Sequence, residues 1–256
     1  MARCIVIANQ KGGVGKTTTA VNVAAALAVM EKKTLLVDCD PQGNASSGVG
    51  VYPEKIGESL YSVLYEPSRA REAVYETSLP SLHVIPSTAD LVAADIELVD
   101  KPGRETYLRK VLASLDGEYE FILLDCAPSL GLITLNALCA ASELLVPLQC
   151  EYYALEGIAQ LLRTVELVRR RFNADLRLLG VALTMYDGRN KLNRHVRQEI
   201  QNCFPGQHFE TLIPRNVRVS EAPSHGQSVI DYDVKSKGAE AYLELAREVL
   251  ARLSVS

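Results

Sequence analysis

Residues 7–20 read "IANQKGGVGKTTTA", a glycine-rich segment between an apolar run and a second run rich in alanine. Residues 15–17 match the end of the phosphate-binding motif G-x-x-x-x-G-K-[ST], but Gln10 stands where the motif has its first glycine. Because the two runs are typical of a strand and a helix, the segment has the strand–loop–helix order that the motif requires. It also holds a second lysine, Lys11, five residues before Lys16.

A loop of this composition is suited to a nucleoside triphosphate. Glycines allow backbone N–H groups to converge on phosphate oxygens, and the following helix directs its positive end toward them. Lys16 is expected to neutralise the β- and γ-phosphates, and the Thr17 hydroxyl to hold Mg²⁺. A glycine-rich turn with a chance G-K-T is the alternative, which the order of the elements disfavours. We predict nucleotide contacts from Gly12, Gly13, Val14, Gly15, Lys16, Thr17 and Thr18.

Two further segments place acids after apolar runs, "LLVDCDPQGN" with Asp38 and Asp40, and "FILLDCAPS" with Asp125. An acid at the end of a buried strand commonly supports Mg²⁺ directly or through water, so Asp125 and Asp38 are candidate metal residues. A helix cap or a turn is the alternative for either one, and Asp38 could serve Mg²⁺ or support the loop. We predict that Asp40, two residues further along an extended chain, orients the water that attacks the γ-phosphate.

The order of apolar runs predicts the fold class. Strand-like runs alternate with helix-like segments, which indicates an α/β fold: a doubly wound, largely parallel sheet with helices on both faces. The first helix is apolar all round up to Met30 and should be mostly buried. The expected strands are Cys4–Ala8, Thr34–Val37, Leu82–Ile85, Phe121–Leu124, Leu144–Pro147 and Leu178–Leu183. The other expected helices are Ala89–Val99, Glu105–Leu115, Leu132–Ala141, Leu155–Arg171, Leu192–Cys203 and Ala239–Leu253; residues 51–81 are less regular.

Composition sets wider limits. A chain of 256 residues that is 48% apolar and 23% charged fits one α/β domain, residues 1–256. The sequence opens without a basic signal-peptide region, and its longest mostly apolar stretch, Ala20–Met30, is too short to span a membrane, so we expect a cytoplasmic protein. Six scattered cysteines form no C-x-x-C pair and are expected to be mostly buried. The net charge of −4 gives no general attraction for nucleic acid.

Together, "KGGVGKTT" at 11–18, "DCDPQGN" at 38–44 and "LLDCAPS" at 123–129 resemble the deviant Walker A P-loop ATPases. These include the ParA and Soj partition proteins, MinD, the arsenite-pump ATPases and the nitrogenase iron protein. Residues 213–246 resemble the small chromosomal ParA (Soj) branch in particular. The resemblance implies ATP and Mg²⁺ as cofactors, slow hydrolysis, a role in chromosome or plasmid segregation, and stimulation by a ParB-type centromere-binding partner.

The resemblance also gives Lys11 a role as the signature lysine, which reaches the phosphates of a second subunit when two ATP-bound chains form a homodimer. A cation supplied in this way acts as an arginine finger does. A solvated surface lysine is the alternative. Gly12, where the two loops would meet, is expected to tolerate no side chain. The resemblance further implies that Pro214 and Asn216 contact the adenine.

Residues 185–218 hold six Lys or Arg against three acids, in a chain that is acidic as a whole. Presented twice on a dimer, such a segment favours nonspecific, salt-sensitive binding to double-stranded DNA. In the ParA resemblance Arg189 and Arg218 are the DNA-binding residues, which implies association with the nucleoid. An ordinary solvated helix face and loop is the alternative for each arginine.

Three other functions remain as alternatives. One is a ParA-like protein that positions a different cargo, such as a chemoreceptor array, a flagellum or a protein compartment. Another is MinD-like positioning on a membrane, which the last 18 residues disfavour because they hold three glutamates against two arginines. Metal-cluster assembly is disfavoured by the cysteine spacing. The motif begins at residue 10, so no N-terminal helix-turn-helix that would bind an operator is expected.

Overall fold

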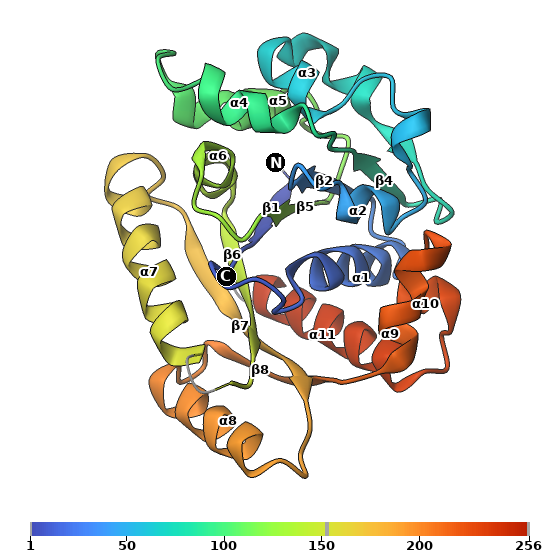
Figure 1. Ribbon diagram of the computed structural model, residues 1–256, viewed down its shortest axis with the longest axis vertical. Helices are drawn as coiled ribbons and strands as arrows, with labels where there is room; N and C mark the ends of the chain where they lie inside the picture. Colours follow the sequence, from blue (N-terminus) through green and yellow to red (C-terminus); the bar gives the residue numbers. More distant parts are fainter. Residues whose placement is uncertain (1, 152–153, 255–256) are drawn as a thin grey trace.

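The computed structural model describes residues 2–151 and 154–254, and its centre is one eight-stranded sheet in the order β3-β4-β2-β5-β1-β6-β7-β8 (Figure 1). Strand β3 pairs with β4 in the antiparallel sense, and all other pairs are parallel. This arrangement confirms the predicted α/β class. The strands are β1 (Arg3–Ile7), β2 (Thr34–Cys39), β3 (Tyr75–Glu76), β4 (Leu82–Ile85), β5 (Phe121–Cys126), β6 (Glu143–Gln149), β7 (Arg177–Tyr186) and β8 (His208–Pro214).

Helices cover both faces of the sheet, as predicted. Helices α1, α10 and α11 pack on one face, and α3 to α8 on the other (Figure 1). The helices are α1 (Lys16–Val29), α2 (Asn44–Ser47), α3 (Leu60–Tyr65), α4 (Leu91–Glu97), α5 (Tyr107–Ala113), α6 (Leu132–Ala140), α7 (Ala154–Arg171), α8 (Lys191–Cys203), α9 (Val217–Glu221), α10 (Val229–Tyr232) and α11 (Lys237–Ser254).

The sheet separates two apolar cores. Alternate residues of a strand point to opposite faces, so Val6 of β1 joins the core under α3 to α8 while Ile5 and Ile7 join the core under α1 and α11. Helix α1 packs on the sheet beside α11 and is buried along most of its length, as its apolar composition predicted. The expected helix Ala239–Leu253 is part of α11, and its apolar side faces the core: the buried residues include Ala239, Tyr242, Leu245, Ala246, Val249 and Leu253.

The strand order brings the conspicuous polar segments to one edge. Strand β5 lies between β1 and β2, so Asp125 pairs in register with Ile7 on one side and with Asp38 on the other. The glycine-rich loop starts where β1 ends. Because parallel strands share their carboxyl edge, the loop and both acidic segments meet there.

Some elements differ from the predictions. Strand β8 was not predicted, because Glu210 and Thr211 interrupt its apolar pattern; Glu248 of α11 accepts their backbone N–H groups at 2.8 and 3.1 Å. Residues 105–115 were predicted to form one helix. The segment instead begins as a 3₁₀ turn, where the Asn136 side chain donates to the Arg104 carbonyl oxygen at 2.7 Å and accepts from the Leu108 N–H at 3.2 Å.

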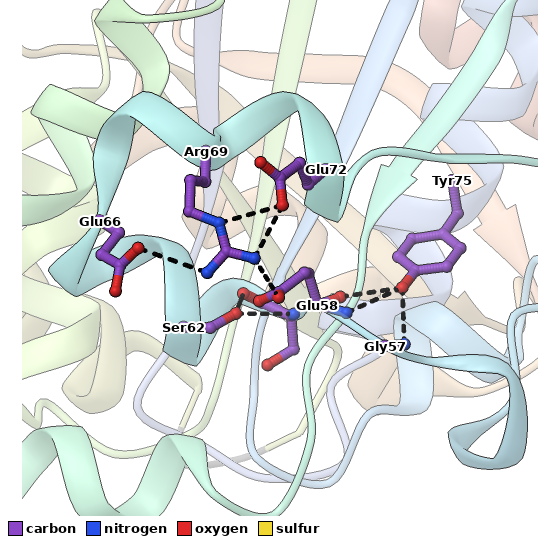
Figure 2. A network of polar contacts seen from close by, with 8 residues as sticks. Gly57, Glu58, Ser62, Glu66, Arg69, Glu72 and Tyr75 are labelled. Carbon is purple, nitrogen blue, oxygen red and sulfur yellow. Dashed lines mark hydrogen bonds and ion pairs between the residues drawn. The ribbon is translucent and has the colours of Figure 1, made fainter.

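The less regular residues 51–81 form α3, two 3₁₀ segments and β3. Arg69 holds this region together: its guanidinium contacts Glu58, Glu66 and Glu72 at 2.5, 3.3 and 2.7 Å (Figure 2). The Tyr75 hydroxyl accepts the Gly57 N–H at 2.8 Å. Side-chain contacts of this kind have no periodic signal, which is why the sequence pattern was weak here.

Candidate nucleotide-binding site

The glycine-rich loop occupies residues 8–15, between β1 and α1. Gly13 and Gly15 have φ values of 73° and 84°, a left-handed conformation that only glycine adopts without strain. Lys16 begins α1, is 6% exposed, and donates from Nζ to the Lys11 carbonyl oxygen at 2.9 Å. Burial lowers the pKa of Lys16, while the nearby Asp125 and Asp40 carboxylates act in the opposite direction. The lysine is thus held inside the loop next to two acids.

Neighbouring strands fix the backbone of this loop. Thr184 of β7 donates from Oγ1 to the Val14 carbonyl oxygen at 2.8 Å. Asn9 donates to the Pro147 carbonyl oxygen of β6 at 2.8 Å and accepts the Lys11 N–H at 3.0 Å. These bonds link the loop to β6 and β7, which lie beyond β1 in the sheet. Neither Asn9 nor Thr184 was singled out from the sequence.

Asp125 is the most unusual group in the site. Both carboxylate oxygens are buried and have no hydrogen-bond partner within the described part of the chain. Burial and the Asp38 carboxylate raise the pKa of Asp125 well above its ordinary value; Thr17 lies close enough to favour the charged form, without a hydrogen bond of normal geometry. An orphaned buried carboxylate calls for a cationic ligand or a proton.

The second acidic segment has a different arrangement. The Asp38 carboxylate accepts the Ser46 N–H at 2.8 Å, the Ser46 hydroxyl at 2.6 Å and the Asp40 N–H at 3.1 Å. Burial raises the pKa of Asp38 to about 6, against these three hydrogen bonds. Asp38 therefore ties the end of β2 to helix α2. The chain bends at Asp40 instead of continuing as a strand, and Asp40 is 8% exposed and accepts the Gln42 N–H at 3.0 Å.

Lys11 is paired with an acid that lies outside the loop. Its ammonium group forms an ion pair with Glu151, just past the end of β6, and both side chains are partly exposed. Glu151 was missed in the sequence, although an acid after an apolar strand was the signal that identified Asp125. Gly12 has open space around it in a single chain: an added Cβ would meet nothing within 4 Å. The predicted intolerance at Gly12 therefore depends on a second copy.

A pocket of about 480 Å³ opens beside the loop, a volume typical of small-molecule sites. Four of the predicted nucleotide residues share it: Gly15 from the loop, Thr18 from α1, Pro214 at the end of β8 and Asn216 just before α9. The Asn216 side-chain oxygen caps α9 by accepting the Arg218 and Val219 N–H groups at 2.9 and 3.4 Å. Arg215, which lies between Pro214 and Asn216, also lines the pocket; the remaining walls, which the sequence did not indicate, are Thr184, Met185, Ile213, Val217, Val219, Ser220, Pro223 and Tyr242.

The two arginines predicted to bind DNA lie on separate elements. Arg189 precedes α8; its side chain is 93% exposed and it contacts Asp187 through two guanidinium nitrogens at 3.0 Å. Arg218 lies in α9 and pairs with Glu221 at 2.8 Å and Asp233 at 3.4 Å. Each arginine is therefore accessible, with an acid beside it that a phosphate would have to replace.

Two further predictions concern the class of protein. Five of the six cysteines are buried and Cys203 is exposed, which confirms the expected packing role for most of them. Within residues 2–151 and 154–254, no helix combines the length and apolar character needed to cross a bilayer.

The sequence is similar to proteins that are named for chromosome partitioning. The family described as "AAA domain" matches residues 2–178. The chain is 52% identical over 252 residues to "Chromosome partitioning protein ParA" of Myxococcus xanthus, covering 98% of this chain and 89% of that protein. It is 49% identical over 252 residues to "Chromosome-partitioning ATPase Soj" of Treponema pallidum, covering 98% of each.

Solved structures agree in fold. A structure named cobyrinic acid a,c-diamide synthase from Mycobacterium smegmatis, with bound ADP and magnesium, is 38% identical, with a TM-score of 0.87 over 99% of this chain and 96% of that one. The MinD cell division ATPase of Pyrococcus furiosus is 28% identical, with a TM-score of 0.81 over 98% and 99%. The match extends over almost the whole chain in both cases.

Proposed function

Because this chain belongs to the ParA/Soj family of chromosome-partitioning ATPases, we propose that it is a dimerising switch that binds DNA nonspecifically in its ATP state and segregates a chromosome or plasmid with a ParB-type partner. The observation that carries the proposal is the pair of lysines in one loop. Lys16 is buried inside its own loop, whereas Lys11 is partly exposed and, within the described part of the chain, is paired with a partly exposed acid. The two cations therefore serve different phosphates.

The residues present fit ATP and Mg²⁺. The orphaned Asp125 carboxylate and the adjacent Thr17 hydroxyl are oxygen ligands of the kind that Mg²⁺ prefers. Gln10 Nε2 is likewise buried without a partner in the described chain, so a phosphate oxygen would supply the acceptor that it lacks. Mg²⁺ would neutralise phosphate charge as the terminal phosphate leaves. Asp125 and Thr17 would hold it, with Asp38 in loop support through Ser46.

Different residues of the chain then have different roles in hydrolysis. The N–H groups of the loop cradle the phosphates, and Lys16 moves from the Lys11 carbonyl oxygen to the β- and γ-phosphates. Asp40, at the bend after β2, orients the attacking water. The adenine ring of ATP occupies the pocket beside Pro214 and Asn216, where the Asn216 side-chain oxygen already caps α9. A contact to adenine would therefore come from Asn216 Nδ2.

ATP acts as the link between two chains. Lys11 leaves Glu151 and reaches the phosphates of the facing subunit, where only a triphosphate carries enough charge for both lysines. Arg189 and Arg218 are then presented twice, so the dimer gains the charge density that nonspecific DNA binding requires. Hydrolysis, slow until the partner stimulates it, separates the chains and releases the DNA.

Light scattering coupled to size-exclusion chromatography tests the proposal. The wild-type chain should be monomeric with ADP and dimeric with ATP and Mg²⁺. Lys11→Ala should bind ATP and stay monomeric, and Lys16→Ala should lose both nucleotide binding and dimerisation. Lys32→Ala, which removes a surface lysine paired with Glu120, is the matched control and should dimerise normally. A Lys11→Ala protein that dimerises like wild type contradicts the proposal.

A further inference from the structure

Helix α4 carries an apolar surface that the core does not use. Its inward residues Leu91 and Ala94 are buried, whereas Val92, Ile96 and Val99 are 53%, 72% and 46% exposed. Val92 and Ile96 lie one turn apart on α4, and Val99 follows in the turn after the helix ends at Glu97. Asp95 lies on the same face because it is three residues after Val92. We refer to Val92, Asp95, Ile96 and Val99 as the α4 stripe.

Leu130 extends the α4 stripe. It is 40% exposed and immediately precedes Gly131, where an added Cβ would lie 2.9 Å from the Asp95 carboxylate. Four of the ten large exposed apolar side chains in the described chain therefore fall in this one region. Clustering of this kind marks an interaction surface, whereas single exposed apolar residues do not.

The surroundings of the stripe are acidic. Residues 88–100 contain four acids and no lysine or arginine. Asp90, Glu97 and Asp100 are exposed, and Glu97 is held in place by the hydroxyls of Tyr61 and Tyr65 at 3.1 and 2.6 Å. The nearest basic residues along the chain, Lys101 and Arg104, follow the last member of the stripe; Arg104 donates to the Val99 carbonyl oxygen and pairs with Glu105. An apolar strip with an acidic rim complements a cationic amphipathic helix.

The α4 stripe is also connected to the ATPase site. The Asp95 carboxylate accepts the Ile133 N–H at 3.0 Å, in the first turn of α6. Residues 127–131 join that turn to the end of β5, where Asp125 lies. A molecule that covers the stripe therefore contacts the side chain that positions the loop following Asp125.

We propose that the α4 stripe and Leu130 form the docking surface for a cationic amphipathic helix of the partner protein that stimulates hydrolysis. The proposal rests on the proposed function for the existence of that partner. The acidic rim favours a positively charged occupant, and the apolar strip that it borders suits the apolar face of an amphipathic helix. A docked helix that contacts Asp95 then alters the position of the loop that follows Asp125.

Binding of a synthetic peptide tests the surface directly. The probe is a fluorescein-labelled, 18-residue peptide of leucine and lysine with one apolar face, and its control is a scrambled isomer of equal charge. We expect the amphipathic peptide to bind wild type and to bind Ile96→Lys at least about tenfold more weakly, as for a central interface residue. Val234→Lys, which alters a valine that is 56% exposed elsewhere, should bind like wild type.

The hydrolysis rate provides the second readout. The amphipathic peptide should change the ATPase rate of wild type and of Val234→Lys but not of Ile96→Lys, whose rate without peptide should equal wild type. Equal binding of the peptide to all three proteins, equal binding of the scrambled isomer, or no binding to wild type overturns the proposal.

Measuring dimerisation distinguishes a failure of the docking proposal from a failure of the proposed function. Ile96→Lys should still dimerise with ATP. If it does not while wild type does, the stripe contacts a second copy of this chain, which overturns the docking proposal and leaves the switch intact. If wild type also fails to dimerise, the switch is wrong, and peptide binding measured with ADP still decides whether the stripe is a docking surface.

Discussion

Lys11 is paired with Glu151, an acid two residues beyond the end of β6. The Lys11 and Glu151 side chains are 38% and 44% exposed, so solvent screens the pair and its contribution to stability is small. A triphosphate on a facing subunit can therefore compete for the lysine at little cost. In the proposed switch, Lys11 is paired with Glu151 of its own chain in the nucleotide-free state and contacts the phosphates of the facing subunit in the ATP state.

A substitution at Gly12 should block dimer formation without affecting nucleotide binding. Its Cβ position is open and its backbone is not left-handed, so Gly12→Val should fold and bind ATP as a monomer. The added side chain should block the approach of a second loop. Gly15 has φ 84°, so Gly15→Val should instead strain the loop and weaken ATP binding itself. Isothermal titration and light scattering check both; an ATP dimer of Gly12→Val would show that the loops do not meet there.

Asp40→Ala should trap the ATP dimer. Without a carboxylate to orient the attacking water, hydrolysis should fall by about 100-fold, in the range found for loss of a catalytic acid–base group. ATP binding should be retained, because Lys16 and the loop are intact. Phosphate release under single-turnover conditions is the measurement, with Asp175→Ala, an exposed acid at the opposite edge of the sheet, as control. Hydrolysis by Asp40→Ala at the wild-type rate contradicts the role given to Asp40.

Arg189 and Arg218 should affect DNA binding without affecting ATP hydrolysis. Each is paired on the surface, so Arg189→Ala and Arg218→Ala should fold normally. Each should weaken binding to random-sequence DNA uniformly and reduce the salt dependence, because a phosphate contact is lost. Arg247→Ala is the control, since Arg247 has a similar pair with Glu244 on α11. Unchanged salt dependence in both variants would remove these arginines from the DNA contact.

Asp125→Asn should make the nucleotide-free and Mg²⁺-free protein more stable at alkaline pH. The folded-state pKa of Asp125 is raised by burial, so the folded chain retains a proton that the unfolded chain has lost. The associated stability is present below the ordinary value of 3.8 and is lost as the pH rises through the folded-state pKa. The variant's advantage should therefore grow from pH 5 to pH 8 and reach a few degrees in Tm.

Thermal unfolding at the two pH values, with and without ATP and Mg²⁺, provides the check. Wild type should gain stability from ATP and Mg²⁺ at pH 8, whereas Asp125→Asn should gain much less because it lacks the anionic ligand. A variant that is less stable than wild type at pH 8 without ligands would mean that Asp125 is not an uncompensated buried acid.

The sequence predicted those parts of the molecule that have a regular apolar pattern or that follow a known motif. The strands that carry the loop, Asp38 and Asp125 are continuous apolar runs, and the helix after Lys16 is apolar on every side. The class of fold and the grouping of these acids at one edge followed from those patterns.

What the sequence could not predict depends on the strand order. Glu151 approaches Lys11 only because β6 lies beside β1, and Thr184 reaches Val14 from β7. The support of Asp38 by Ser46 depends on the four-residue helix α2 after the strand, which is too short to show a periodic pattern. Strand β8 was missed because three of its seven residues are polar, and two of its backbone N–H groups are bound by Glu248 of α11.

DNA binding by the Asp40→Ala protein tests the central claim most directly. Fluorescence anisotropy of a random-sequence duplex would be followed during titration with this protein, with ATP or with ADP, at two salt concentrations. Binding is expected with ATP only, and it should weaken steeply as salt increases. Absence of binding in every nucleotide state, or equal binding with ATP and ADP, would contradict a switch in which ATP controls attachment to DNA.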